Sequence, residues 1–145
     1  MSTESSAAPL KLLLLVPRSL TPREIEEVSP QVHTALKEVL GLEGVSLLDS
    51  AEWYRQQFGA SGNWDSWVWE TVTGRDYGTR QRHFGGFVVV GDRLGRASAE
   101  IVRLALQNGR VVLHWAPNST LSCVQSVTDC GEGVWQVGKA TQIGG

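Results

Sequence analysis

The chain has 145 residues, of which 41% are hydrophobic and 19% charged, and its formal net charge is −2 at pH 7. This is ordinary globular composition for one domain, so it excludes disorder and fibrous repeats over most of the length. The near-neutral charge argues against a general nucleic-acid binder, and no apolar run reaches the roughly 18 residues of a membrane span.

The first residues are polar and small, with no positive segment followed by a long apolar one, so they do not read as a signal peptide. We expect residues 1–10 to be a flexible tail and residues 11–145 to form a single α/β domain in the cytoplasm.

The first predicted strand is the continuous apolar run Lys11–Val16, typical of a strand buried on both faces. Thr21 and Glu24, with a proline after the threonine, form the pattern of a capping box that begins a helix. Apolar residues at helical spacing continue this helix over Ile25–Val39. Pro30 is expected to interrupt the helix or to restart it.

A second short strand is predicted at Val45–Leu48, and it ends at an acidic residue. Asp49 and Glu52 form a second cap pair, which leads into a short helix over Trp53–Phe58.

The segment after this helix is rich in tryptophan and arginine. Trp64–Thr73 is a predicted helix, and Gly74–Gly86 is a glycine-rich, basic loop or flap that carries Arg75, Arg80 and Arg82. Aromatic faces stack on bases and arginines pair with phosphates, so the segment could be a lid over a nucleotide. Alternatively, the indoles pack a helix on the sheet or form a subunit interface. We favour packing for Trp67 and Val68.

The rest of the chain continues the alternation of strands and helices. The predicted elements are a strand at Phe87–Val90, a turn at Gly91–Arg96, a helix at Ala97–Asn108 and a strand at Val111–Trp115. The last two segments, Ser122–Val127 and Val134–Ala140, are expected to form a hairpin or to add a final strand. Such alternation, with continuous apolar strands, predicts a mainly parallel sheet of four to five strands covered by helices.

Ligands of open α/β sheets bind outside the carboxyl ends of the strands. The turn Gly91–Arg96 is the most informative strand end, because its glycines allow a close approach and a helix N-terminus follows. Arg93 and Arg96 would add donors for an anion. The alternative is an ordinary loop with solvated arginines. The predicted ligand-binding residues at the strand ends are Arg18, Ser19, Gly91, Arg93, Gly95, Arg96 and Ser98.

The segment from Phe87 to Glu100, followed by Ala105 and the run Gly109–Val112, resembles the core of the nucleoside 2-deoxyribosyltransferase-like group. It is also similar to the related nucleotide-binding Rossmann-like (SLOG) families. The resemblance covers about 26 residues and implies a Rossmann-like (flavodoxin-like) three-layer sandwich. It also implies a nucleoside or nucleotide ligand.

By this resemblance, Glu100 is the candidate nucleophile for transfer or hydrolysis of an N-glycosidic bond. Asp49 or Asp92 would be the acid or base, and Tyr77 a positioning group. From the residues alone, we favour the alternative that Glu100 is a first-turn acid that interacts with the helix dipole. It follows Ser98 by two positions where the family has three, which rotates the side chain by about 100°.

No metal or cofactor is predicted. The three histidines fit no metal-ligand spacing, and the motifs of ATPases, dinucleotide oxidoreductases and α/β-hydrolases are missing from the sequence. Cys123 and Cys130 are predicted to be ordinary thiols, with a bridge across a hairpin as the alternative.

Three functions follow from these patterns. The first is a nucleoside- or nucleotide-binding protein that cleaves or transfers an N-glycosidic bond. The second is a non-catalytic nucleotide sensor or assembly module that keeps the fold. The third is a protein-interaction role for the tryptophan-rich segment, which would form a homo-oligomer. No membrane partner is expected in any of them.

Overall fold

The computed structural model describes residues 11–17, 20–41, 44–57, 64–76, 78, 80–91, 93–116, 120–131 and 134–142. The strands in this part of the chain are β1 (Lys11–Leu15), β2 (Ser46–Asp49), β3 (Gly86–Val90), β4 (Arg93–Leu94), β5 (Val112–Trp115), β6 (Leu121–Gly131) and β7 (Val134–Gln142). The helices are α1 (Pro22–Leu40), α2 (Ser50–Gln57), α3 (Trp64–Thr73) and α4 (Arg96–Gln107). The α/β class predicted from the alternation of elements is confirmed.

The strands form one seven-stranded sheet in the order β2-β1-β3-β5-β6-β7-β4. The β2-β1-β3-β5 half is parallel, and the β5-β6-β7-β4 half is antiparallel. The prediction of a mainly parallel sheet of four to five strands was therefore wrong. The parallel half follows from the strand–helix alternation, whereas the long β6–β7 hairpin adds antiparallel strands at its end.

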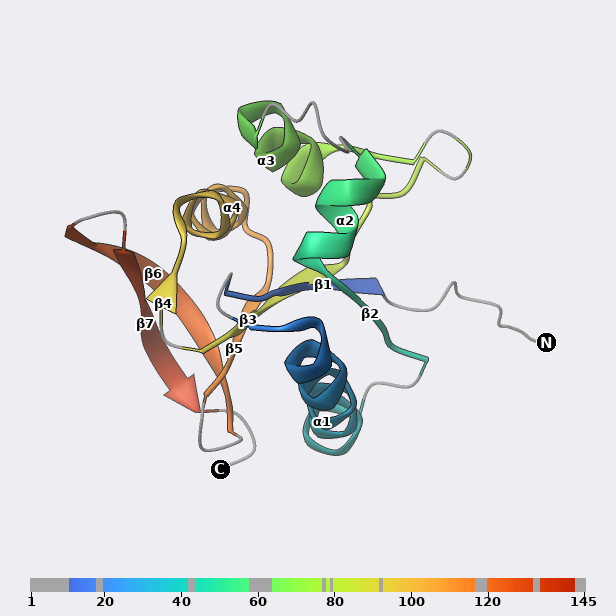
Figure 1. Cartoon of the computed structure of the whole chain (residues 1–145), viewed down its shortest axis with the longest axis vertical. Helices are drawn as coiled ribbons and strands as arrows, with labels where there is room; N and C mark the ends of the chain where they lie inside the picture. The colour runs from blue at the N-terminus through green and yellow to red at the C-terminus, as the bar shows by residue number, and fades with distance from the viewer. Residues whose placement is uncertain are drawn as a thin grey trace.

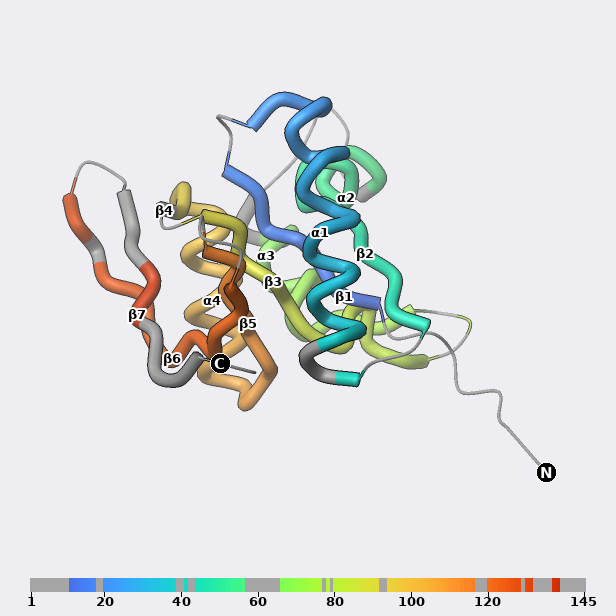
Figure 2. Tube along the Cα trace, turned by 90° about the horizontal axis from the view of Figure 1, so that it is seen from below, coloured from blue at the N-terminus to red at the C-terminus, as the bar shows by residue number. Residues whose placement is uncertain are grey.

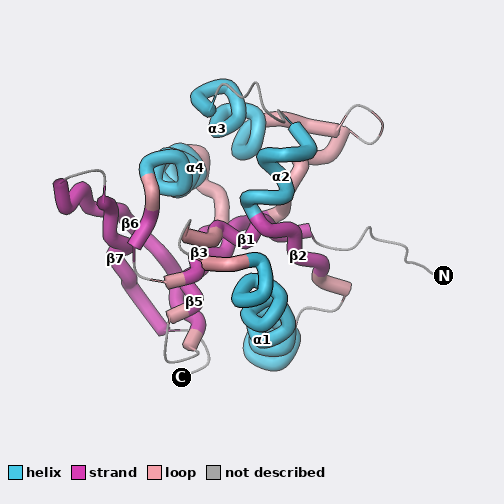
Figure 3. The backbone as a smooth tube through the Cα atoms, viewed as in Figure 1, coloured by secondary structure: helices cyan, strands magenta, loops and turns pink. Residues whose placement is uncertain are grey.

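Helices cover both faces of the sheet, with α1 on one face and α2, α3 and α4 on the other (Figure 1). The secondary-structure colouring of Figure 3 shows the strands between these two helical layers. Alternate residues of each central strand point to opposite faces, so each face has its own core. The α1 side contains Leu12, Leu14, Val32, Leu36 and Val88, and the other side Leu13, Leu15, Trp53, Phe87 and Ile101.

Helix α1 begins as the sequence predicts. Thr21 and Glu24 form a capping box, and Gly41 ends the helix in a left-handed conformation. Pro30 lies inside one continuous helix, so it neither interrupts nor restarts it. Proline brings no N–H to the helix. In the residue before it, the Ser29 hydroxyl donates to the carbonyl of Ile25 at 2.9 Å.

The antiparallel half of the sheet curls around α4. Arg93 at the start of β4 comes only three positions after Val90 at the end of β3, a span of at most about 11 Å. In a flat sheet these two strands would lie four strand spacings apart, roughly 19 Å. The sheet must therefore bend, and Figure 1 shows β6, β7 and β4 beside α4. Val124 and Val137 of the hairpin share a core with Ile101 of α4.

The predicted hairpin is confirmed and is longer than expected, since β6 pairs with β7 along most of both strands (Figure 2). Cys123 and Cys130 are both free thiols, as predicted. They belong to the same strand, β6, so the alternative of a bridge across the hairpin was wrong.

None of the helices in the described ranges is long and apolar enough to cross a lipid bilayer.

Candidate functional site

The carboxyl ends of the parallel strands form the edge at which the sequence places a ligand. From β1 the chain passes to β2 on one side, and it then returns past β1 to β3 on the other side. The strand order thus reverses between β1 and β3. The register aligns Leu15 of β1 with Val89 of β3, so residues 16 and 17 and residues 90 and 91 flank this point.

On the β2 side of this edge, the side chains of Asp49 and Ser50 accept hydrogen bonds from backbone N–H groups. The Asp49 carboxylate accepts a hydrogen bond from the Glu52 N–H at 2.9 Å, as the predicted cap pair requires. The Ser50 hydroxyl is buried and accepts from the Val16 N–H at 3.2 Å. Ser50 therefore ties the end of β1 to the start of α2. Arg18 and Ser19 lie outside the described residues.

On the β3 side, Gly91 leaves the strand with φ +83°, a left-handed conformation that favours glycine. Its N–H donates to the Trp115 carbonyl at 3.1 Å. Its carbonyl accepts from Nε2 of His114, a fully buried residue of β5, at 2.8 Å. His114 thereby fixes the rim of the site. The only sign of this role in the sequence was that His114 is a polar residue inside the apolar run of β5. Asp92 lies outside the described residues.

The expected open turn at Gly91–Arg96 contains a strand instead. Arg93 and Leu94 form β4 and pair with Gln136 and Trp135 of β7. The Leu94 side chain is buried in the core. The backbone of Arg93 and Leu94 is thus held against β7 and does not form an open phosphate-binding turn.

Helix α4 begins directly after this strand. Gly95 is its N-cap and supplies no side-chain hydrogen bond to the first turn. Arg96 at the first helical position is exposed, and Ser98 is half-buried. First-turn N–H groups have no partner inside the helix, so this end offers donors to an anion.

The candidate nucleophile is held in an ion pair on α4. An oxygen of Glu100 accepts from Arg103 at 3.2 Å, and both side chains are partly exposed. The structure thus gives each of the two carboxylates that the resemblance pairs a local partner, Arg103 for Glu100 and the Glu52 N–H for Asp49. Tyr77 lies outside the described residues.

The arginine-rich segment lies at the opposite edge. Arg75 and Arg82 face each other across an antiparallel bridge, and the chain then enters β3 at Gly86. Residues just before a strand lie at its amino end, and the five residues of β3 extend for roughly 15 Å. The segment therefore does not cover the carboxyl edge, and the predicted lid is not formed by its described residues.

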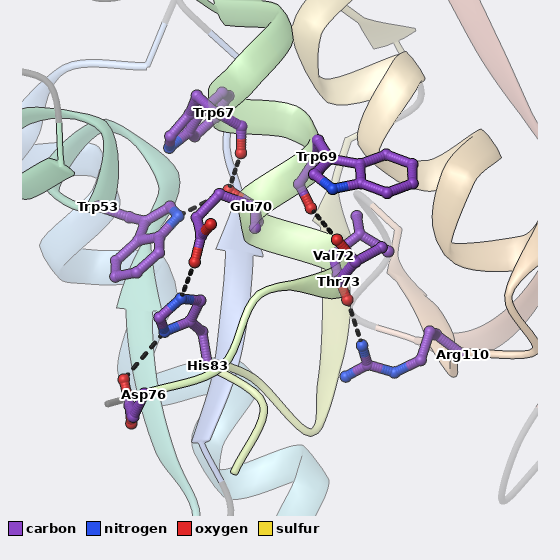
Figure 4. Close-up of polar contacts among 10 residues, drawn as sticks. Trp53, Trp67, Trp69, Glu70, Val72, Thr73, Asp76, His83 and Arg110 are labelled. Carbon is purple, nitrogen blue, oxygen red and sulfur yellow. Dashed lines mark hydrogen bonds and ion pairs between the residues drawn. The ribbon is translucent and has the colours of Figure 1, made fainter. Parts of the chain in front are cut away.

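The tryptophans divide into core and surface. Trp53 and Trp67 are each 4% exposed, and Val68 is also buried, so the predicted packing of Trp67 and Val68 is confirmed. Nε1 of Trp53 donates to the hydroxyl of Thr71 at 2.8 Å (Figure 4). Trp69 is 62% exposed. The homo-oligomer expected from this segment stays a prediction, and Trp69 is the residue to test for it.

Below Trp53, a histidine lies between two carboxylates. Nε2 of His83 is 2.7 Å from Glu70 and Nδ1 is 3.0 Å from Asp76 (Figure 4). Carboxylates only accept, so the ring donates from both nitrogens when both contacts are hydrogen bonds. The Trp53 ring lies 5.0 Å from the imidazole, centroid to centroid. In the part of the chain that the structure describes, no group of three or more His, Cys, Asp or Glu residues could hold a metal ion.

No family model, no curated protein and no solved structure matches this chain.

Proposed function

We propose that the chain binds a nucleoside or nucleotide at the carboxyl edge of its parallel strands, between β1 and β3, and does not cleave it. The observation that carries this proposal is the reversal of strand order at this point. In open α/β sheets such a reversal leaves a crevice, because the two connections leave toward opposite faces of the sheet. Here α1 follows β1 on one face, and the chain after β3 continues to α4 on the other (Figure 1).

Two further features support an anionic or polar ligand at this edge. The order β2-β1-β3-β5 is that of a flavodoxin-like half-sheet, which supports the Rossmann-like assignment. Helix α4 has Gly95 as its N-cap and no side-chain cap, so the N–H groups of its first turn are available to an anion. Arg96 stands at this turn and would contact a phosphate if the ligand carries one.

The non-catalytic form of the proposal rests on the two carboxylates. Glu100 is paired with Arg103, and Asp49 caps α2. A nucleophile and an acid must approach the same glycosidic bond from its two ends, with the two carboxyl groups about 5–5.5 Å apart in retaining enzymes. Each carboxylate here already has a structural partner, which favours the binding function over transfer or hydrolysis.

A thermal-shift screen with nucleosides, nucleotides and dinucleotides tests the proposal, with release of free base followed by chromatography in the same samples. A ligand at one hundred times its dissociation constant stabilises the protein by about 2.7 kcal/mol. We expect stabilisation without base release. Arg96→Ala should weaken the binding of nucleotides, and Arg103→Ala, which removes the same side chain two turns further along α4, should not.

Either part of the proposal can fail by itself. If no nucleoside or nucleotide raises the melting temperature, the carboxyl edge is not a nucleotide site. If base is released by the wild type and not by Glu100→Gln, the chain is an N-glycosidic enzyme and Glu100 is its nucleophile.

A further inference from the structure

Two arginines face each other at the amino edge of the sheet, far from the proposed nucleotide site. Arg75 and Arg82 are partners in an antiparallel bridge, and both side chains are exposed. Side chains at facing positions of such a pair extend to the same side, with Cβ atoms about 5 Å apart. Like charges at facing positions are destabilising. Across the described ranges, neither arginine forms an ion pair with a carboxylate.

A third arginine is fixed beside this pair. Arg110 precedes β5, and its guanidinium donates to the Val72 carbonyl at the end of α3, at 2.6 Å, and to the Phe84 carbonyl before β3. Partial burial lowers the pKa of Arg110, and the charges of Arg82 and then Arg75 lower it further. The three guanidinium groups therefore act on one another, although Arg110 comes from a distant part of the sequence.

The acidic groups of this region are turned away from the arginines. Successive side chains of an extended chain point to opposite sides, so Asp76 and His83 lie on the side of the bridge opposite to their neighbours Arg75 and Arg82. There Asp76 contacts His83. Figure 4 shows this histidine cluster and Arg110 on different sides of the end of α3. The carboxylates of Glu70 and Asp76 thus contact His83, and the positive charges of Arg75 and Arg82 remain available to another anion.

We propose that Arg75, Arg82 and Arg110 form a binding site for the phosphate group of a small anion, at the amino edge of the sheet. A guanidinium group presents five donors in a fixed fork that matches the oxygens of a phosphate. One Nη of Arg75 is held by the Arg80 carbonyl at 3.0 Å, and two N–H groups of Arg110 are held by backbone carbonyls. These bonds orient both forks and leave further donors for the ligand.

A phosphate dianion in this position would offset the repulsion between Arg75 and Arg82. The chain as a whole is slightly acidic, so this patch is a local excess of positive charge. A polyphosphate group, with more oxygens and more charge, should bind more tightly than a single phosphate. The site is independent of the proposed nucleotide site, because the two lie at opposite ends of β3.

Titrations of the whole chain with inorganic phosphate and pyrophosphate test the site, followed by calorimetry and by the NMR signals of the arginine Nε–H groups. Ionic strength is kept constant with sodium chloride. The variant Arg75→Gln/Arg82→Gln removes the facing charges and keeps polar side chains of similar length. Arg23→Gln, an exposed arginine on the opposite face of the sheet, is the matched control. Arg110 is left unchanged, because it also holds two backbone carbonyls.

We expect pyrophosphate to bind the wild type and the control equally, and the double variant at least about tenfold more weakly. Without ligand, the double variant should melt at the same temperature as the wild type or higher, because a repulsion is removed. A merely structural role of the arginines predicts the opposite shift. Arg96→Ala should leave pyrophosphate binding unchanged, which separates this site from the carboxyl edge.

Three results would overturn the proposal. The first is no binding beyond the effect of chloride, and the second is equal binding by the double variant and the wild type. The third is tighter binding of a single-stranded oligonucleotide than of pyrophosphate, lost in the same double variant. That last result would assign the patch to nucleic acid instead of a small anion.

Discussion

The hydroxyl of Thr71 joins α2 to α3, and its removal gives a quantitative test of this packing. Thr71 is 1% exposed. Its Oγ1 accepts from Nε1 of Trp53 in α2, at 2.8 Å, and donates to the carbonyl of Trp67 one turn earlier in α3, at 2.6 Å. The variant Thr71→Val keeps the shape of the side chain and removes both hydrogen bonds. The indole N–H of Trp53 is then left in the core without a partner.

The expected loss follows from the burial of Trp53. A buried donor without a partner costs about 1–3 kcal/mol, whereas the Trp67 carbonyl keeps its place in the helix and adds little. We expect Thr71→Val to lower the free energy of unfolding by about 2 kcal/mol. For a chain of this length, that is a fall of roughly 7 °C in melting temperature.

Trp53→Phe removes the donor from the same bond and also leaves a cavity. In the double variant no indole N–H remains to be satisfied. Its cost should therefore be smaller than the sum of the single costs, by about 1 kcal/mol. This difference measures the hydrogen bond between the two helices separately from the loss of packing.

Equilibrium unfolding in urea, followed by near-UV circular dichroism, measures all three variants. Thr73→Val is the control, because its hydroxyl also donates to a carbonyl one turn earlier, that of Trp69, and no indole of the described residues donates to it. The control should change the free energy of unfolding by less than about 0.5 kcal/mol. If Thr71→Val is equally mild, or its effect adds fully to that of Trp53→Phe, the indole is hydrated and the two helices do not pack in this way.

Substitutions at two further positions test local structure by the same measurement. Asp49→Ala should cost about 1 kcal/mol through loss of the cap on the Glu52 N–H, and Asp49→Asn only a few tenths. Equal losses in both variants would mean that the charge, rather than the cap, is what matters. Arg80 has φ +60°, so Arg80→Gly should stabilise the chain by about 0.5 kcal/mol, because relief of the left-handed strain exceeds the entropy that glycine loses. A lower melting temperature would show instead that the arginine side chain holds this turn.

The parts of the fold that local patterns control could be predicted from the sequence. The capping box at Thr21 and Glu24 begins α1, and the cap pair at Asp49 begins α2, because a cap involves residues only three positions apart. The apolar runs that became β1 and β3 were found because strands buried on both faces carry no polar residues. These signals need no knowledge of what lies across the sheet.

The features that were missed depend on residues far apart in the chain. β4 has only two residues, and it exists because Arg93 and Leu94 find Gln136 and Trp135 some forty positions later. No periodicity can be read from two residues. The place of Arg110 beside the predicted phosphate-binding arginines was missed for the same reason. The sequence marks Arg75 and Arg82 as basic, whereas Arg110 joins them only through contacts with the ends of α3 and the start of β3.

The pairing of β4 with β7 bears directly on the proposed nucleotide site. Leu94 is buried and paired with Trp135, and α4 begins at Arg96, so Gly95 is the one residue between a fixed strand and the first turn of the helix. The C-terminal hairpin therefore helps to hold that first turn in place relative to the sheet, together with the packing of α4 on the core. Substitutions in β7 should thus alter nucleotide binding at the proposed site between β1 and β3. They should do so although β7 contributes none of the predicted ligand-binding residues. The hairpin that makes the sheet mixed is, on this argument, part of what orients the site.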